Sequence, residues 1–317
     1  MLKLANGRTL YYGKGDVYNY RTYAAPLAVK PIPESPYSGD ANVIFAHNIT
    51  FSVSGEELLT SFTEGDNSRV VATDSMKNFI LRETAGYEGS TTEGLLFYIS
   101  EKFLAKYAHM EAIELSARRI PFLPLEVRGE NGFVPSGLVY RRSHNDHASA
   151  AMSLVRTDAG CEIRSLECSL SDLQLIKVSG SSFYGFVRDE YTTLPDSYDR
   201  PLFIFLDIHW RYADVNDALD ATRGNYVAAE QIRDLAHHVF HEKNSPSIQS
   251  LIYQIGRRIL TRFPQLAEVR FESNNRTWEA VVEPKSGTEP GVFTEPRPPF
   301  GFQGFTMTRD DLAAGEA

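Results

Sequence analysis

The segment from Phe183 to Arg200 holds residue types that could bind a flat anionic ring. It opens with an aromatic–Gly–aromatic run in a strand-like pattern, continues through a charged and hydroxylated run over residues 188–193, and has a turn signal at Pro195–Asp196. The phenyl face of Phe183 could cover a heterocycle, while the planar guanidinium of Arg200 could donate to two in-plane acceptors. A core strand followed by an ordinary surface ion pair is the alternative that the spacing leaves open.

Two places in the first quarter of the chain also hold candidate chemistry. Lys14 stands between two glycines just before the strand-like run 17–23, which indicates close backbone approach or an unusual dihedral angle. Thr73, Asp74 and Ser75 precede an amphipathic run and are typical of a helix N-cap. The same helix start could receive an anion through free N–H groups and a favourable dipole. The alternatives are a solvated loop and a plain cap.

In the second half of the chain, Gln249 follows Ser247 at the expected start of a long helix. Its amide offers a donor and an acceptor in one plane, which suits the amide edge of a purine. A surface glutamine in a first helical turn is the alternative. Three histidines, His237, His238 and His241, have ligand-like spacing on a helix, but no glutamate stands between them as in zinc proteases, and no third ligand is evident.

Cofactor motifs do not accompany these candidates. The sequence has neither a glycine-rich dinucleotide fingerprint after a strand nor a Gly-x-Ser-x-Gly elbow. We therefore expect no metal and no cofactor, so any redox chemistry would have to come from the substrate.

Composition limits the class of protein. The chain has 317 residues, a natural length for two domains, and its 42% hydrophobic and 23% charged residues are an ordinary globular balance. The formal net charge of −9 argues against a nucleic-acid-binding surface. A small anionic substrate would have to be captured by local cations rather than by the overall field.

The cysteines and the chain ends predict a cytoplasmic protein. Cys161 and Cys168 lie in an alternating, strand-like segment, and their spacing fits neither a zinc hook nor a CxxC redox pair. We expect buried or half-buried thiols in a reducing compartment. The N-terminal run MLKLANGRTLYYGKG lacks the apolar core of a signal peptide, and no run approaches a membrane span. The final residues, AGEA, carry no Ser-Lys-Leu address.

The elements that position the candidates can be predicted from residue periodicity. Alternation predicts strands over 42–55 and 58–73 that form an antiparallel pair, and helical spacing predicts a helix over 92–107. Strands are also expected over 112–122, 201–210 and 269–282. The proline-rich run 290–305 is expected to be an extended covering segment.

The second half of the chain repeats the first at a constant offset of 156 residues. Val71-Ala72 aligns with Val227-Ala228, and Glu93-x-Leu95 aligns with Gln249-x-Leu251. The register continues without a gap from residue 71 to residue 115. Such a register predicts two copies of one unit, each with two antiparallel strands, two helices and further strands.

The run Phe183-x-Gly-Phe-x-Arg-Asp-Glu-Tyr-Thr-Thr-Leu, with Asp-Arg a few residues on, closely resembles the urate oxidase (uricase) family, particularly its bacterial branch. The resemblance extends from Tyr11 to Leu312. It implies an α+β fold of two tandem tunnelling-fold (T-fold) domains, 11–165 and 166–312, with antiparallel sheets and paired helices. It further implies sheets that join into a barrel between subunits, and a homotetramer with active sites at the subunit interfaces.

The resemblance also implies an activity, the oxidation of urate by dioxygen to 5-hydroxyisourate with release of hydrogen peroxide. Doubly deprotonated urate would supply the electrons, so no cofactor is implied. Lys14 and Thr73 match the dyad that removes a proton from urate, and Thr73 would also hold water or dioxygen above the ring. Asp74 would contribute its backbone N–H. Thr73 and Asp74 would reach the site from the neighbouring subunit.

The substrate-binding residues implied by the resemblance lie mostly in the second half. Phe183 would stack under the purine, and Arg200 and Gln249 would clamp opposite edges. The other residues of the site are Leu194, the backbone of Ile248, and Asn274 or Asn275.

One position departs from the family pattern. Most members have a histidine in the segment 273–278, and alignment on Thr277 and Trp278 puts Arg276 there. A permanently charged arginine cannot shuttle a proton as histidine does, but it can stabilise the urate dianion or a peroxide. Arg276 is therefore a candidate catalytic residue, and we expect an altered pH profile.

Two other function classes stay open. A T-fold enzyme acting on pterins would keep a carboxylate at the ring edge, and Gln249 argues against it, although Glu93 stands at the equivalent position of the first copy. A non-catalytic protein that binds purines or pterins is the second class. It would bind urate without consuming oxygen, and Arg276 is the residue that keeps it open.

Overall fold

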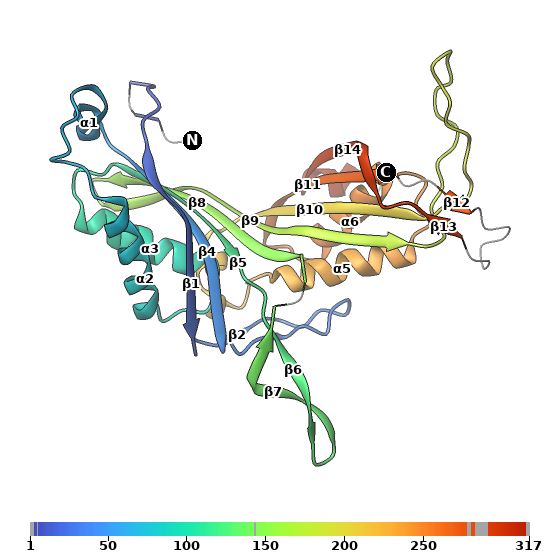
Figure 1. Cartoon of the computed structure of the whole chain (residues 1–317), viewed down its shortest axis with the longest axis horizontal. Helices are drawn as coiled ribbons and strands as arrows, with labels where there is room; N and C mark the ends of the chain where they lie inside the picture. The colour runs from blue at the N-terminus through green and yellow to red at the C-terminus, as the bar shows by residue number, and fades with distance from the viewer. Residues whose placement is uncertain (1–2, 5, 143, 278–279, 283–290, 315–317) are drawn as a thin grey trace. The chain divides into compact units, whose positions relative to one another are not determined.

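The computed structural model describes residues 3–4, 6–142, 144–277, 280–282 and 291–314 (Figure 1). Their architecture is α+β, with a large antiparallel sheet and helices. Contacts divide the chain into two compact units. The first contains Met1–Pro31, Tyr37–Ser169 and Arg211–Ala228, and the second contains Ile32–Pro36, Leu170–Trp210 and Ala229–Ala317. Within the described residues, no helix is both long and apolar enough to cross a membrane.

The first unit has four neighbouring antiparallel strands in the order β1 (Tyr12–Thr22), β4 (Ile44–Ser54), β5 (Ala112–Arg119) and β8 (His147–Thr157). The helices α2 (Thr73–Gly86) and α3 (Thr92–Lys106) pack on one face of these strands (Figure 1). The core between them is aromatic and aliphatic, and the rings of Phe51 and Phe103 meet edge to face at 4.8 Å. The smaller elements of this unit are β2 (Leu27–Ala28), β3 (Gly39–Asp40), the 3₁₀ turns Glu56–Leu58 and Ala221–Arg223, α1 (Leu59–Thr63) and α4 (Asn216–Leu219).

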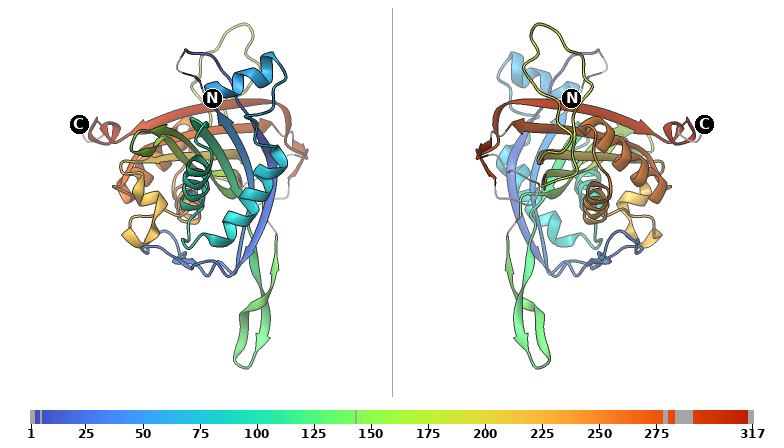
Figure 2. Two further views of the ribbon diagram at one scale, coloured as in Figure 1. Left: turned by 90° about the vertical axis from the view of Figure 1, so that its left-hand side faces the viewer. Right: turned by 90° about the vertical axis from the view of Figure 1, so that its right-hand side faces the viewer.

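A long hairpin extends from the first unit. Its strands, β6 (Leu123–Gly129) and β7 (Gly132–Arg141), project away from the sheet of that unit (Figures 1 and 2). The side chains of Phe133 and Leu138 are 72% and 89% exposed. Apolar side chains on a projecting hairpin are typical of a surface that another chain covers.

In the second unit, β10 (Leu202–Tyr212, of which the last two residues belong to the first unit), β11 (Leu266–Thr277) and β14 (Arg297–Thr308) are neighbours, with the helices α5 (Ala229–Glu242) and α6 (Ile248–Arg262). α6 packs on α5 and on the β11–β14 pair. β9 (Gly160–Lys177) belongs to both units and carries the two cysteines, both free: Cys161 is half-buried and Cys168 is buried, as predicted. The remaining elements are β12 (Ala280–Val282), β13 (Val292–Phe293) and α7 (Asp310–Ala314).

The helix pairs reproduce the register found in the sequence. α5 begins and ends 156 residues after α2 (73 to 229, 86 to 242), and α6 does the same after α3 (92 to 248, 106 to 262). We call the segment with α2 and α3 the first copy and the segment with α5 and α6 the second copy. The N-caps also match, because Thr91 accepts from the Gly94 N–H at 3.0 Å and Ser247 accepts from the Ser250 N–H at 3.1 Å.

The C-terminal ends of α3 and α6 are held by equivalent arginines. Arg156 donates to the carbonyls of Leu104, Tyr107 and Met110, and Arg309 donates to those of Leu260 and Leu266. A cation at this end satisfies carbonyls that have no helical partner.

Two predicted elements were wrong. The run 58–73 is not a strand, because Leu59 and Phe62 follow helical spacing in the short helix α1, for which Leu58 is the N-cap residue. β4 pairs with β1 and β5 instead. The proline-rich run is extended as predicted, but it does not act as a covering segment: most of it forms β14, which pairs with β11 at the end of the strand order. An edge strand tolerates proline, and the β11–β14 register shifts at the prolines.

Candidate active site

Lys14 lies on β1 opposite Phe51 of β4, just before a shift in register between Lys14 and Val17. The preceding Gly13 has no room for a side chain, since an added Cβ would lie 1.9 Å from the Phe51 carbonyl oxygen. The close backbone approach predicted from the two glycines is therefore confirmed at Gly13.

The hydroxyl of Tyr12 joins β1 to the residues that lead into α2. It donates to the Val71 carbonyl at 3.1 Å and accepts from the Val71 N–H at 2.8 Å. Burial raises the pKa of the Tyr12 phenol above its ordinary value. Sequence reasoning missed Tyr12, because a tyrosine two residues before a lysine carries no signal of its own.

The start of α2 lacks a side-chain cap. Ala72 is the N-cap residue, and its carbonyl accepts from the Met76 N–H at 3.1 Å. Thr73 is the first helical residue, so the predicted N-cap chemistry of residues 73–75 was wrong. The N–H groups of this first turn have no side chain folded back on them, which leaves the anion-receiving end of the dipole open.

Asp74, the second residue of α2, shows that Lys14 lies near this helix start. The carboxylate of Asp74 receives the Lys77 ammonium at 2.5 Å and the Asn78 amide at 2.9 Å. The hydrogen bond and charge of Lys77 lower the pKa of Asp74, and the charge of Lys14 lowers it further. Thr73 and Asp74 are thus neighbours at the start of α2, and Lys14 belongs to the same unit.

In the second unit, Phe183 and Arg200 form a stacked pair. The guanidinium carbon of Arg200 lies 5.5 Å from the centroid of the Phe183 ring. The Nε atom of Arg200 is buried without a hydrogen-bond partner, and burial lowers the pKa of its guanidinium. A buried donor without a partner is costly unless a ligand supplies one.

The run Phe183–Phe186 is not a regular strand. Phe183 forms one isolated bridge with Ser197, and Gly185 turns the chain with φ 73°. This turn lets the rings of Phe183 and Phe186 stack with centroids 5.0 Å apart and planes at 11°. The Phe183–Phe186 stack is a second feature that the sequence did not show, since neither residue's ring direction follows from the pattern.

The turn predicted at Pro195–Asp196 occurs earlier in the chain. The Thr192 N–H donates to the Asp189 carbonyl at 3.2 Å, and the described turn is at residues 190–191. Leu194, which follows this turn, is exposed, and its carbonyl accepts a hydrogen bond from Arg188 at 3.4 Å. Arg188 in turn lies over the Phe186 ring.

Backbone hydrogen bonds tie Arg200 and Phe183 to the residues before α6. The Arg200 N–H donates to the Ser181 carbonyl at 2.8 Å, and the Ser182 N–H donates to the Ser245 carbonyl at 2.9 Å. α6 begins three residues after Ser245. These contacts assemble the aromatic ring, the guanidinium and the helix start within one unit.

Asp199 organises the same loop. Its carboxylate accepts from the Ser179 hydroxyl and from the Gly180 N–H, each at 2.7 Å. These two hydrogen bonds lower the pKa of Asp199. Asp199 therefore stabilises the backbone beside Arg200, which is a different role from the surface ion pair considered for these two residues.

At the start of α6, Ile248 is buried and Gln249 is exposed as the second helical residue. Ser247 caps the helix, so the Gln249 side chain is not needed for capping. Its amide is presented at a helix N-terminus, where a donor toward an anionic ring edge is favourable.

The strand β11 separates the two asparagine candidates. Asn275 shares the Ser273 side of the strand, and its Oδ1 accepts from Gln303 at 3.5 Å. Asn274 and Arg276 point to the other side, where the Arg276 guanidinium lies 4.3 Å from the Phe205 ring centroid. The Oδ1 of Asn274 and the Nε of Arg276 are both buried without a partner. Trp278, one of the two alignment anchors, lies outside the described residues.

The predicted residues thus fall into two groups. Lys14, Thr73 and Asp74 belong to the first unit, and the others belong to the second. Among the described residues, no group of three or more His, Cys, Asp or Glu side chains is arranged to hold a metal ion. His238 of the HHxxH run pairs with Glu242 at 2.9 Å.

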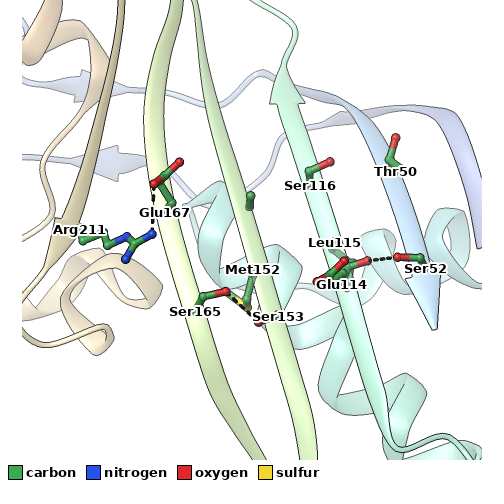
Figure 3. Close-up of a pocket in the computed structure, with 11 residues that line it drawn as sticks. Thr50, Ser52, Glu114, Leu115, Ser116, Met152, Ser153, Ser165, Glu167 and Arg211 are labelled. Atoms are coloured by element: carbon green, nitrogen blue, oxygen red, sulfur yellow. Dashed lines mark hydrogen bonds and ion pairs between the residues drawn. The ribbon is translucent and has the colours of Figure 1, made fainter. Parts of the chain in front are cut away.

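A separate pocket of about 340 Å³ lies on the sheet of the first unit (Figure 3). Its lining is mostly hydroxyl and carboxylate groups from alternate strand positions, with the Glu167–Arg211 ion pair at 3.4 Å and the Ser153–Ser165 hydrogen bond at 2.8 Å. It includes none of the predicted site residues. The sheet therefore has an apolar side under α2 and α3 and a polar side at this pocket.

Comparison with known proteins covers nearly the whole chain. The Uricase family pattern matches residues 52–151 and 166–303. The chain is 51% identical over 304 residues to a uricase of Haloferax volcanii, covering 95% of this chain and 98% of that protein. It is 54% identical over 307 residues to the uric acid degradation bifunctional protein of Bacillus sp. TB-90, covering 96% of this chain and 61% of that protein.

The second bifunctional relative, from Bacillus subtilis, is likewise matched over 62% of its length, so the chain spans about three fifths of these two proteins. A solved uricase structure from Bacillus fastidious superposes with a TM-score of 0.95 at 55% identity, covering 98% of this chain and 97% of that one.

Proposed function

Since the chain belongs to the uricase family, we propose that it oxidises urate with dioxygen and water to 5-hydroxyisourate and hydrogen peroxide. Urate gives two electrons to dioxygen, which leaves as hydrogen peroxide, and the oxygen of a water molecule is added to the ring. The single observation that carries this proposal is the Phe183–Arg200 pair, an aromatic face beside a buried guanidinium with an unpartnered Nε.

In this proposal the second-unit residues bind the purine. Phe183 stacks on the ring, and Arg200 donates to one edge while Gln249 donates to and accepts from the opposite edge. The Ile248 backbone and Leu194 complete the wall. Asn274 is the site asparagine rather than Asn275, because it shares its side of β11 with Arg276 and has a free Oδ1.

The first-unit residues carry out the proton chemistry. Lys14 takes a proton from bound urate in concert with the Thr73 hydroxyl, and Thr73 holds the water or dioxygen. The Asp74 backbone N–H lies in the uncapped first turn of α2, where it stabilises developing negative charge. Urate itself supplies the electrons, so the proposal requires no cofactor.

The proposed assembly is a homotetramer of tandem T-fold chains, with domains 11–165 and 166–312, whose sheets join into barrels. Thr73 and Asp74 then complete a site of the neighbouring subunit, and Lys14 of the same chain acts with them at that site. The matching helix bounds and caps support the tandem architecture, and the polar side of the sheet in Figure 3 suits a solvated barrel interior. The apolar hairpin β6–β7 supplies surface for subunit contact. The proposed compartment is the cytoplasm, where unpaired cysteines are ordinary.

Arg276 replaces the histidine of most family members and is proposed to stabilise the urate dianion or peroxide. Replacing it with histidine exchanges a fixed charge for one that titrates near neutral pH. We expect Arg276→His to change the pH profile of kcat, by less than about tenfold at any one pH. Arg297→His on the paired strand is the control. An unchanged rate across the pH range for Arg276→His would contradict this role.

The test of the proposed function is the loss of urate's ultraviolet absorbance measured together with oxygen uptake, in buffer containing a strong chelator. Equal consumption of urate and oxygen with peroxide formation is the expected result. Binding of urate without oxygen uptake would instead identify the chain as a purine-binding protein, the alternative that Arg276 keeps open.

A further inference from the structure

The structure contains the same pair of tyrosine hydrogen bonds before the first helix of each copy, although Tyr12 is the first residue of β1 and Tyr212 is the last residue of β10. In the first copy, Tyr12 donates to the Val71 carbonyl and accepts from the Val71 N–H. In the second, Tyr212 donates to the Val227 carbonyl at 3.4 Å and accepts from the Val227 N–H at 2.8 Å. Each valine stands two residues before a helix, α2 or α5. A single hydroxyl thus satisfies both backbone groups of one residue at each helix entrance.

The surroundings of the two tyrosines differ. Lys14 is two residues beyond Tyr12, and Thr73 begins the helix that follows Val71. Asp214 is two residues beyond Tyr212, and Ala229 begins the helix that follows Val227. The proposed proton-transfer pair is therefore present only in the first copy, although the hydrogen bonds are present in both.

The hydroxyl of Tyr12 is the side-chain group that holds the backbone of Val71, while His109 holds the carbonyl of Arg69 two residues earlier. No side chain caps α2, whereas α3 is capped by Thr91. Side chains two apart on a strand point to the same face, so Tyr12 and Lys14 share a side of β1. The path from the Tyr12 hydroxyl through Val71 and Ala72 to Thr73 is the short connection between the lysine and the threonine.

We propose that Tyr12 is a positioning residue for urate oxidation, which sets the distance between the Lys14 amine and the Thr73 hydroxyl by holding both backbone groups of Val71. This inference rests on the proposed function. A proton-transfer pair loses much of its rate when it is displaced by about an ångström. Tyr12 itself does not touch the reacting atoms.

The experiment compares Tyr12→Phe with Tyr212→Phe in the full chain. Both variants remove the hydroxyl that holds a valine backbone, so both should lower the thermal unfolding temperature. Tyr12→Phe should lower kcat by about ten- to a hundredfold, change KM by less than about twofold, and alter the pH profile of kcat. Tyr212→Phe should keep kcat within about twofold.

A combination of variants separates positioning from general destabilisation. In a Lys14→Met background the pair no longer exists, so adding Tyr12→Phe should cost little further rate. If Tyr12→Phe does not fold at the assay temperature, both phenylalanine variants are compared at a lower temperature at which circular dichroism shows that they are folded.

The outcomes separate the two hypotheses. An active wild type in which Tyr12→Phe and Tyr212→Phe lose equal rate, or in which the Tyr12→Phe loss persists unchanged in Lys14→Met, would overturn the positioning role alone. A folded wild type that consumes no urate would overturn the proposed function and this inference together.

Discussion

The two copies have the same helices but have kept different chemistry at equivalent helix starts. At the start of the first helix, the first copy has Thr73 with Lys14 nearby, and the second has Ala229, which is buried. At the start of the second helix the difference is reversed. Gln249 is exposed in the second copy, whereas Glu93 is buried in the first.

Glu93 is a buried polar residue that bonds to neighbouring side chains of the protein. Its carboxyl accepts from the Tyr226 hydroxyl at 3.1 Å and lies beside the Cys168 thiol. Burial raises the pKa of Glu93, and the hydrogen bonds of Cys168 and Tyr226 offset this only in part. In the proposed site each copy therefore supplies one half, proton transfer in the first copy and purine recognition in the second.

The largest expected effect on the rate comes from removing Lys14, the proposed base in the first copy's half of the site. Lys14→Met should lower kcat by about 100- to 10,000-fold, because the proposed base is lost, with a smaller effect on KM. Steady-state urate depletion measures both constants. Lys77→Met is the matched control, since Lys77 also contacts Asp74, and it should retain kcat within about threefold. Equal losses in the two variants would mean that α2 needs only positive charge.

A smaller effect is expected when the second copy is given the first copy's residue. Gln249→Glu replaces an amide with a carboxylate facing an anionic ring, which should lower kcat/KM by about 100-fold at neutral pH. Activity should recover in part as the pH falls and the carboxyl is protonated. A pH series of kcat/KM tests this, with Gln254→Glu on the same helix as control. A loss that is the same at every pH would argue that Gln249 packs and does not bind the ring edge.

The reciprocal change, Glu93→Gln, should leave urate kinetics within about twofold and act on stability. The folded-state pKa of Glu93 is raised above its unfolded value, so its contribution is fully present below about pH 4.3 and is lost as the pH rises through the folded pKa. The variant cannot ionise, so its unfolding temperature should rise relative to wild type as the pH increases. The exposed control Glu88→Gln should show no such trend. A constant difference at every pH would rule out titration of Glu93.

The sequence predicts the bounds of the helix pair well, but it predicts poorly how the first helix, α2, begins. Constant register from residue 71 to residue 115 specifies the bounds of α5 and α6, because helix spacing and capping are local properties. The start of α2 depends instead on a hydroxyl from β1, 59 residues away in sequence. A hydrogen bond between residues so far apart does not appear in the periodicity of the sequence, which explains why Thr73 was predicted as a cap.

The same distinction applies to the binding residues. Phe183 and Arg200 could be named from residue type, and the structure places the guanidinium over the ring. The stack of Phe186 on Phe183 and the sides of β11 taken by Asn274 and Asn275 depend on ring direction and strand register. Neither follows from one sequence. The strand predicted over 58–73 was wrong for a simpler reason. A short apolar segment fits both the helical period and the strand period.

Labelling of the two cysteines of β9 can report how often the folded chain opens. Cys161 is half-buried, so a thiol-reactive dye reaches it in the native protein, whereas Cys168 is buried beside Glu93 and becomes reactive only when that part of the first copy opens. The mass of a labelled sample therefore counts how many molecules have opened in a given time. Urate or an inhibitor that holds the native chain closed would slow the second label and leave the first unchanged.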